Sequence, residues 1–286
     1  MTKTTTTSIS LVPPTEAVVS IYPDTKPKTV RLVSRNPTKL PELWCAIFIV
    51  GSEPYQFPQL FARAKCWKAK TIEEADIVLF TGGIADVSPA MYGARPHKET
   101  MSEAEEDMRD ILVFLEAVTL GVPMIGVCRG AQFGNVMNGG KLFQHVDQHN
   151  KNHEIFVRRN QYYMTASSVH HQMCMPNEEG GMEIIAEAYE STGKWSDDKT
   201  YKSSHTDFDV EAFWYPETAF LGFQGHPEYA GVEEYTKFFI EIIEQYIATN
   251  PDLKIIEGKQ RLDKAIMEQR SWRIPDTVNE FIKEYS

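Results

Sequence analysis

Hydrophobic residues in this chain form short unbroken runs separated by longer amphipathic stretches. Three of the runs are apolar throughout, which is typical of parallel strands covered on both faces; they lie at 44–50, 75–80 and 124–127. Helices are expected between and after these runs, at 59–69, 102–119 and 130–137. Strands alternating with helices at these lengths predict a parallel α/β sheet with right-handed crossovers.

The expected helix at 102–119 has its own signals. Ser102 to Glu105 has the spacing of a capping box, in which a serine and a glutamate satisfy the first free N–H groups of a helix. Its apolar face is expected to consist of Ile111, Leu112, Leu115 and Val118.

The second half of the chain is less regular. Extended segments are expected at 155–169, 184–188 and 218–224. Apolar residues at helical spacing predict an amphipathic helix over 231–248. The chain has no internal repeat, so we expect an N-terminal arm at 1–40, one α/β domain at 41–248 and a C-terminal helical extension at 249–286, with a helix at 259–269.

The amino-acid composition and net charge exclude several classes of protein. Forty acidic and 29 basic side chains give a net charge of −11, which argues against a nucleic-acid binder or a protein of anionic membrane surfaces. The chain has neither a long uninterrupted apolar run nor an apolar N-terminal signal, so we expect a cytoplasmic protein. Four unevenly spaced cysteines without a C-x-x-C motif are expected to be free thiols.

The strongest local motif is the segment from Gly126 to Gly130, where Cys128 lies between a short apolar strand and a helix. Glycines on both sides allow the sharp turn of a nucleophile elbow. The thiol would then lie at the carboxyl end of a strand and at a helix N-terminus, which favours the thiolate. The alternative from these residues alone is a buried structural cysteine beside a tight turn.

A thiol nucleophile needs a base, and His226 is the candidate. Glu228 follows at i+2, so on an extended segment its carboxylate lies on the same side and can orient the imidazole. Gly82 and Gly83 follow the second strand, where the Gly83 amide can face a developing oxyanion together with the amide of Arg129. A surface loop and a plain turn are the alternatives for these two segments.

Several further motifs accompany these residues, and together they carry a resemblance. They are Arg109-Asp110, Gly126 to Gln132, Asn135-Val136, Gly139-Gly140, Leu142, Ser168 to Gln172 and Phe223 to Glu228. This set resembles the class I glutamine amidotransferases, and is most similar to their γ-glutamyl hydrolase branch, which includes γ-glutamyl-γ-aminobutyrate hydrolases. The resemblance implies a flavodoxin-like, mostly parallel sheet flanked by helices.

The resemblance also implies roles for individual residues. Cys128 would form a γ-glutamyl thioester, His226 would protonate the leaving amine and later activate water, and Glu228 would orient His226. The amides of Gly83 and Arg129 would hold the oxyanion. The residues expected to bind a small γ-glutamyl substrate are Gly82, Gln132, His170, His171 and Gln172. Gly225 departs from the branch, which usually has a bulky residue there, and this change is expected to open the pocket beside His226.

Three functions remain in competition. The first is a stand-alone hydrolase of γ-glutamyl amides, and the second is a glutaminase subunit that passes ammonia to a separate synthetase. The third is a non-catalytic binding module of the same fold. Separately, the tail at 249–286 is the better candidate for a partner or self-association surface, and its alternative is packing onto its own domain. No cofactor is expected. Histidines at 145, 149 and 153 make a metal site conceivable, but no recognised ligand motif accompanies them, so no metal is expected either.

Overall fold

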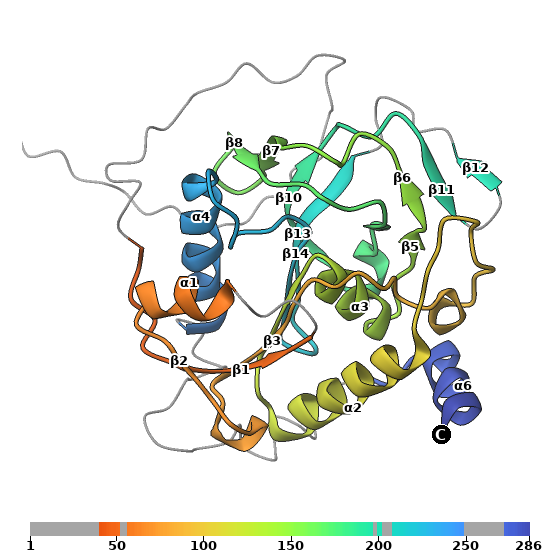
Figure 1. Cartoon of the computed structure of the whole chain (residues 1–286), viewed down its shortest axis with the longest axis horizontal. Coiled ribbons are helices and arrows are strands. Elements are labelled where there is room, and N and C mark those ends of the chain that lie inside the picture. The colour runs from red at the N-terminus through yellow and green to blue at the C-terminus, as the bar shows by residue number, and fades with distance from the viewer. Residues whose placement is uncertain (1–39, 52–55, 197–198, 202–207, 249–271) are drawn as a thin grey trace, which may run out of the picture.

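The computed structural model describes residues 40–51, 56–196, 199–201, 208–248 and 272–286. The expected arm, apart from Leu40, and the expected helix at 259–269 therefore lie outside the described residues. Within the described residues, a nine-stranded sheet with the order β2-β1-β3-β4-β14-β13-β10-β7-β8 forms the centre of the fold (Figure 1).

The sheet has two halves that differ in direction. The parallel half consists of β2 (Trp67–Lys68), β1 (Ala46–Val50), β3 (Ile77–Phe80), β4 (Met124–Val127) and β14 (Phe220–Phe223). The antiparallel half consists of β13 (Asp209–Tyr215), β10 (Glu183–Ala188), β7 (His153–Val157) and β8 (Tyr162–Ala166). The predicted α/β fold with a parallel sheet is confirmed, and the antiparallel half extends it beyond what the sequence patterns predicted.

Five α-helices cover this sheet among the described residues. They are α1 (Phe57–Arg63), α2 (Ala104–Leu120), α3 (Arg129–Met137), α4 (Glu233–Ile243) and α6 (Asp276–Tyr285). Short 3₁₀ turns are η1 (Ile72–Glu74), η2 (Pro89–Tyr92) and η3 (Glu178–Gly180), and a π-helical turn, η4 (Glu244–Ala248), continues α4. Two small sheets join β5 (Leu142–Phe143) to β9 (Met173–Cys174), and β6 (His145–Val146) to β11 (Lys194–Ser196) and β12 (Lys199–Tyr201).

Two hydrophobic clusters lie on opposite faces of the sheet. Helices α1 and α4 cover one face, and α2, α3 and α6 cover the other (Figure 1). The strands supply both clusters because successive side chains alternate between faces, so that Ile77 and Leu79 pack with α1 and α4 while Val78 and Phe80 pack with α2 and α3. This two-sided burial explains why the central strands are apolar at every position.

Helix α2 differs from its sequence prediction at two points. The expected capping box is absent, because the N-cap residue is Glu103 and no side chain caps the helix. Ser102 instead forms a bridge with Asp86, whose carboxylate accepts a hydrogen bond from the amide of Met101 at 2.8 Å. The expected apolar face is also wrong at Leu112, which is 62% exposed, while Phe114 is fully buried.

The C-terminal residues pack against this same domain. Val278 and Phe281 of α6 are buried in the cluster that contains α2 and α3. The Trp272 indole donates a hydrogen bond to the carbonyl of Met137 at 3.2 Å, and its ring lies 5.7 Å from that of Phe114. Among the described residues, no helix is both long enough and apolar enough to cross a membrane.

The aromatic contacts of Phe114 generate a stability prediction. Phe114 packs against the rings of Phe80, Phe133 and Phe220, so Phe114→Ala should lower the free energy of unfolding by about 3–5 kcal/mol through lost burial and a cavity. Leu112→Ala, on the exposed side of the same helix, should change it by less than about 0.5 kcal/mol. Urea unfolding of both variants is the measurement, and equal losses would contradict this packing.

Candidate active site

Cys128 lies in a sharply strained turn directly after β4. Its φ of 51° and ψ of −111° are unusual for a residue with a side chain, and such strain persists only where neighbouring structure enforces it. A Cβ on Gly126 would lie 2.4 Å from the carbonyl oxygen of Gly130, and one on Gly130 would lie 2.2 Å from that of Phe80. Only glycine fits at both positions, so the local sequence builds the elbow that presents Cys128.

The pairing of β4 with β14 brings Cys128 to His226. The two strands are parallel neighbours with Val127 opposite Phe223, and the amide of Cys128 donates to the carbonyl of Phe223 at 2.8 Å. The chain then continues from β14 to His226, which lies close enough to Cys128 for that residue to raise the pKa of its imidazole. Residues far apart in the sequence thus meet at the carboxyl end of the parallel strands, where open α/β sheets place their sites.

Glu228 and Cys128 together determine the protonation of His226. The Nδ1 atom of His226 lies 2.8 Å from Oε1 of Glu228, and both side chains are almost fully buried. Burial alone would lower the pKa of His226, but the charge and hydrogen bond of Cys128 and the contact with Glu228 raise it to about 10. The imidazole is therefore cationic at neutral pH, between a sulfur atom and a carboxylate.

Two residues that the sequence analysis missed hold His226 in place. The Ser167 hydroxyl accepts a hydrogen bond from the His226 amide and donates one to its carbonyl, both at 2.7 Å. The Tyr229 ring stacks on the imidazole with centroids 4.4 Å apart and an angle of 8°. Ser167 immediately precedes the predicted segment Ser168 to Gln172, so its place in the sequence was the available signal.

The predicted oxyanion donors lie on both sides of the elbow. Gly82 and Gly83 follow β3, which is the parallel neighbour of β4. Arg129 opens α3, and the first N–H groups of a helix have no partner inside it. In the described part of the chain, the amides of Gly83 and Arg129 donate no hydrogen bond to a protein acceptor. Both are thus available to an anionic ligand atom.

The side chain of Arg129 forms a buried ion-pair cluster with α2. Its guanidinium contacts Asp110 at 2.5 Å and Asp107 at 2.7 Å, with Glu106 at 3.9 Å. Burial raises the pKa of Asp107 to about 6, and it also raises that of Asp110, although Arg129 opposes both shifts. The cluster fixes the start of α3, and with it the amide that follows Cys128.

Three buried glutamine side chains meet one helical turn beyond Cys128. Nε2 of Gln132 donates to the carbonyl of Gln172 at 2.8 Å and lies 3.4 Å from Oε1 of Gln224. Both amide atoms of Gln172 and Nε2 of Gln224 are buried without a hydrogen-bond partner among the described residues. Unpaired buried amides are costly, so this group is suited to a polar ligand. Gln224 was not among the residues predicted to bind substrate.

The adjacent histidines His170 and His171 face different surroundings. Nδ1 of His170 lies 3.0 Å from the carbonyl of Gln172, and burial, together with nearby histidines that include His226, holds its pKa well below the usual range. Nε2 of His171 lies 3.1 Å from Oδ1 of Asp86, and this hydrogen bond raises the pKa of His171. The structure thus places His170 near enough to His226 for their charges to interact, and it pairs His171 with Asp86 and His145.

The prediction that Gly225 opens a pocket beside His226 is wrong. A Cβ on Gly225 would lie 2.6 Å from the carbonyl oxygen of Ser167 and 3.0 Å from the hydroxyl of Tyr235. Tyr235 of α4 is fully buried and occupies this space. Glycine at 225 therefore admits a tyrosine from a neighbouring helix rather than a ligand.

The other three cysteines are buried, and the thiol of Cys174 contacts the carbonyl of Ala131 on α3. The sulfur atoms of Cys45 and Cys66 lie 3.3 Å apart in the core on the α1 and α4 face, and Cys174 is buried on β9. All four cysteines are free, as expected.

Comparison with known proteins gives one family and several relatives. The family model described as Peptidase C26 matches residues 61–228, which is more than half of the chain. YvdE of Lactococcus lactis subsp. lactis, named as a glutamine amidotransferase-like protein, is 39% identical over 74 residues, covering 26% of this chain and 31% of YvdE. NtpR of Enterococcus hirae is 32% identical over 81 residues, covering 28% of this chain and 34% of NtpR. The alignments thus span about a third of these relatives.

A solved structure also resembles the chain. It is a glutamine amido transferase from Methylobacillus flagellatus, with a TM-score of 0.41 and 13% identity. The superposition covers 85% of this chain and 90% of that protein.

The buried cluster around Arg129 gives a second stability prediction. Arg129→Met leaves the carboxylates of Asp107 and Asp110 buried without their cation, so the free energy of unfolding at pH 7 should fall by about 3–5 kcal/mol. Because protonation neutralises these carboxylates, part of the loss should be recovered as the pH is lowered toward 5.

The matched control is Arg109→Met, which removes an exposed arginine from α2, the helix that carries Asp107 and Asp110, and should change the free energy of unfolding by less than about 0.5 kcal/mol. Urea unfolding at pH 7 and pH 5 measures both variants. A loss for Arg129→Met no larger than that of the control would contradict the role assigned to the ion pairs.

Proposed function

Because the chain belongs to the peptidase C26 family, we propose that it hydrolyses the γ-glutamyl amide bond of glutamine or of a γ-glutamyl amine. Family membership supports a hydrolase of the glutamine amidotransferase type, in agreement with the resemblance stated from the motifs. The observation that carries the finer proposal is the contact between the strained Cys128 and the His226–Glu228 pair. A buried structural cysteine would have no need of this arrangement.

The proposed reaction begins with attack of the Cys128 sulfur on the γ-carbonyl carbon of the substrate. The carbonyl oxygen becomes negative and is held by the free amides of Gly83 and Arg129. His226, cationic in the resting enzyme, gives its proton to the leaving nitrogen, and the C–N bond breaks to leave a γ-glutamyl thioester.

The second half of the reaction releases glutamate. Neutral His226 takes a proton from water, which attacks the thioester carbon while the same amides hold the oxyanion. Collapse of this intermediate breaks the C–S bond, returns the thiolate and restores the imidazolium. Glu228 keeps Nδ1 of His226 in place throughout, at 2.8 Å.

The buried amides beside Cys128 support a compact polar substrate. A γ-glutamyl group carries an α-ammonium and an α-carboxylate, which need an acceptor and donors respectively. Gln172 offers an unpaired amide oxygen and an unpaired NH₂ group, and Gln224 offers an unpaired NH₂ group. We assign the glutamyl end of the substrate to these residues and Gln132, with His170 beside the reacting bond.

A second candidate function is a glutaminase that passes ammonia to a separate synthetase. The name of YvdE as a glutamine amidotransferase-like protein favours it. The same cysteine chemistry serves both functions, and they differ in the leaving group and in the need for a partner chain.

The first test separates these functions. The purified chain is incubated with glutamine and with γ-glutamyl amines, and the release of ammonia, glutamate and amine is followed. Amine release without a partner supports the hydrolase, whereas slow glutamine turnover that a second protein accelerates supports the glutaminase. Cys128→Ala should lower kcat/KM by at least about 10³-fold because no thioester can form.

Cys66→Ala is the matched control, because it removes a buried thiol far from His226 in the sequence and should retain activity. If neither substrate is cleaved, and if no glutamine-analogue electrophile labels Cys128, the enzymatic proposal is wrong. A non-catalytic binding module would then remain.

The raised pKa of His226 generates a pH prediction. The imidazolium is the proposed acid and is lost as the pH rises through the pKa of about 10, so kcat/KM should fall on the alkaline side near that value. Glu228→Gln removes a carboxylate that stabilises the cation, and it should therefore move the alkaline limb to lower pH and reduce kcat/KM.

Exposed Glu233 on α4 supplies the control, since Glu233→Gln should leave the pH profile unchanged. The measurement is the pH dependence of kcat/KM for the wild type, Glu228→Gln and Glu233→Gln. An alkaline limb at the same pH in Glu228→Gln and wild type would exclude the proposed role of Glu228.

A further inference from the structure

A cluster of buried histidine and carboxylate side chains lies in the antiparallel half of the sheet and includes none of Cys128, His226 and Glu228. His149 precedes β7, His153 begins β7, and Glu211 lies on β13. Strand β10 separates β7 from β13 in the sheet, so the cluster joins two strands that are not neighbours. All three side chains are 0–1% exposed.

The three side chains of this cluster turn their potential metal-binding atoms toward one another. Nε2 of His153 lies 2.8 Å from Oε1 of Glu211, and Nδ1 of His149 lies 3.9 Å from the same oxygen. One ligand atom from each of the three residues lies within 4.8 Å of the others. Two imidazoles and one carboxylate are a ligand set that binds zinc in proteins and leaves one coordination position open. We propose that His149, His153 and Glu211 bind a divalent transition-metal ion such as Zn²⁺.

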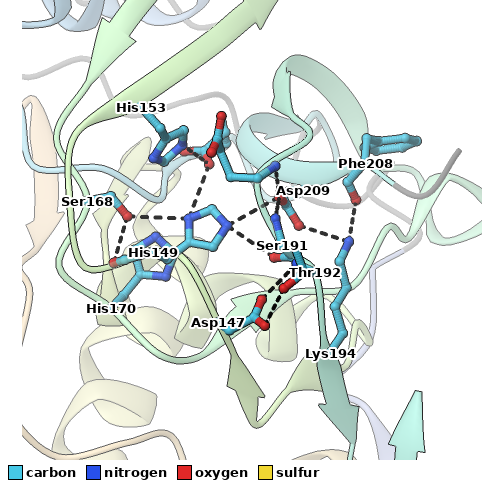
Figure 2. A network of polar contacts seen from close by, with 12 residues as sticks. Asp147, His149, His153, Ser168, His170, Ser191, Thr192, Lys194, Phe208 and Asp209 are labelled. Carbon is cyan, nitrogen blue, oxygen red and sulfur yellow. Dashed lines mark hydrogen bonds and ion pairs between the residues drawn. The ribbon is translucent and has the colours of Figure 1, made fainter. Parts of the chain in front are cut away.

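The surroundings of His149 are those of a metal-binding histidine. Its Nε2 atom lies 3.2 Å from Oδ2 of Asp209 and 3.1 Å from the hydroxyl of Ser191. Figure 2 marks both contacts with dashed lines. A carboxylate at one ring nitrogen fixes the tautomer and leaves the lone pair of the other nitrogen for a metal. Here the other nitrogen, Nδ1, faces Glu211 and lies 3.3 Å from the Ser168 hydroxyl.

Asp209 is itself firmly held. It contacts Nζ of Lys194 at 2.8 Å and accepts hydrogen bonds from the amides of Glu190 and Ser191 (Figure 2). Its charge is thus balanced by Lys194 as well as by its contact with His149. The carboxylate therefore fixes the orientation of the His149 ring.

Unpaired polar atoms provide an independent sign of a missing ligand. Oε2 of Glu211 and Nε2 of His170 are both buried without a hydrogen-bond partner among the described residues. The His170 ring lies 4.7 Å from that of His149, measured between centroids. A cation bound to Glu211 would compensate the buried carboxylate, which is otherwise costly to leave incompletely paired.

This metal site could not be predicted from the sequence, for two reasons. Histidines at 145, 149 and 153 suggest a repeating pattern, but they do not lie on one helix, and His145 stacks with His97 and contacts His171 instead. The carboxylate ligand comes from a strand much later in the chain, so no short motif contains the set. The bound ion would connect β7 to β13 and stabilise the antiparallel half, and this role does not depend on the proposed hydrolase.

The test uses the full chain, treated with a chelator and then titrated with Co²⁺ and with Zn²⁺. We expect one equivalent of metal per chain, a higher melting temperature and the visible absorption of four-coordinate Co²⁺. Ligation by nitrogen and oxygen gives no sulfur-to-cobalt charge-transfer band, which excludes binding at the Cys45–Cys66 pair. Wild-type protein that binds no stoichiometric metal would overturn the proposal and leave an imidazolium–carboxylate pair only.

Matched variants locate the metal. His153→Gln and Glu211→Gln should each weaken binding at least tenfold and abolish the shift in melting temperature, whereas His145→Gln should bind one equivalent as wild type does. Equal loss in His145→Gln would show that the ion binds elsewhere. If the two ligand variants do not fold, X-ray absorption of the zinc-loaded wild type decides between ligation by two imidazoles and a carboxylate and any other set.

Discussion

The close approach of the turn after β4 to the strands on both sides is the constraint on which the rest of the structure depends. On one side Gly130 packs against the carbonyl of Phe80, and on the other the amide of Cys128 is bound to Phe223 of β14. These contacts hold Cys128 at a positive φ that its side chain disfavours. They also determine where His226 lies, because β14 leads directly to it. The strained thiol and its proposed base are therefore positioned by one set of backbone contacts.

Buried charge is arranged differently on the two sides of this turn. On the α2 side of the turn, the Arg129 guanidinium pairs with the carboxylates of Asp107 and Asp110, and these ion pairs anchor the start of α3. On the β14 side, the His226 imidazole lies between Cys128 and the carboxylate of Glu228, and both compensate its positive charge. A buried ion must be paired to be tolerated, so both groups constrain the backbone as well as the chemistry. Substitutions in the first group would affect the second through the position of Cys128.

The sequence predicted the parallel half of the fold well, because its strands are buried on both faces and its glycines are required by close packing. The spans expected for β4 and α3 are nearly those observed, and the motif around Cys128 correctly indicated a strand–turn–helix. Local patterns failed where a residue's partner is distant. Ser102 pairs with Asp86 rather than capping α2, and Leu112 is exposed because the helix turns Phe114 inward.

Contacts across the fold also explain what could not be predicted at the site. The space beside Gly225 is filled by Tyr235 from a different element, a fact that no local motif contains. Likewise, Glu211 lies on β13 and Gln224 directly follows β14, and the amide of Gln224 donates to the carbonyl of Glu211 at 2.8 Å. This β13–β14 hairpin carries the carboxylate of the histidine cluster on one strand and leads to the proposed catalytic base, His226, on the other. An ion that fixed β13 would therefore also restrain the strand that positions His226, so the two sites share one structural element although their chemistry is separate.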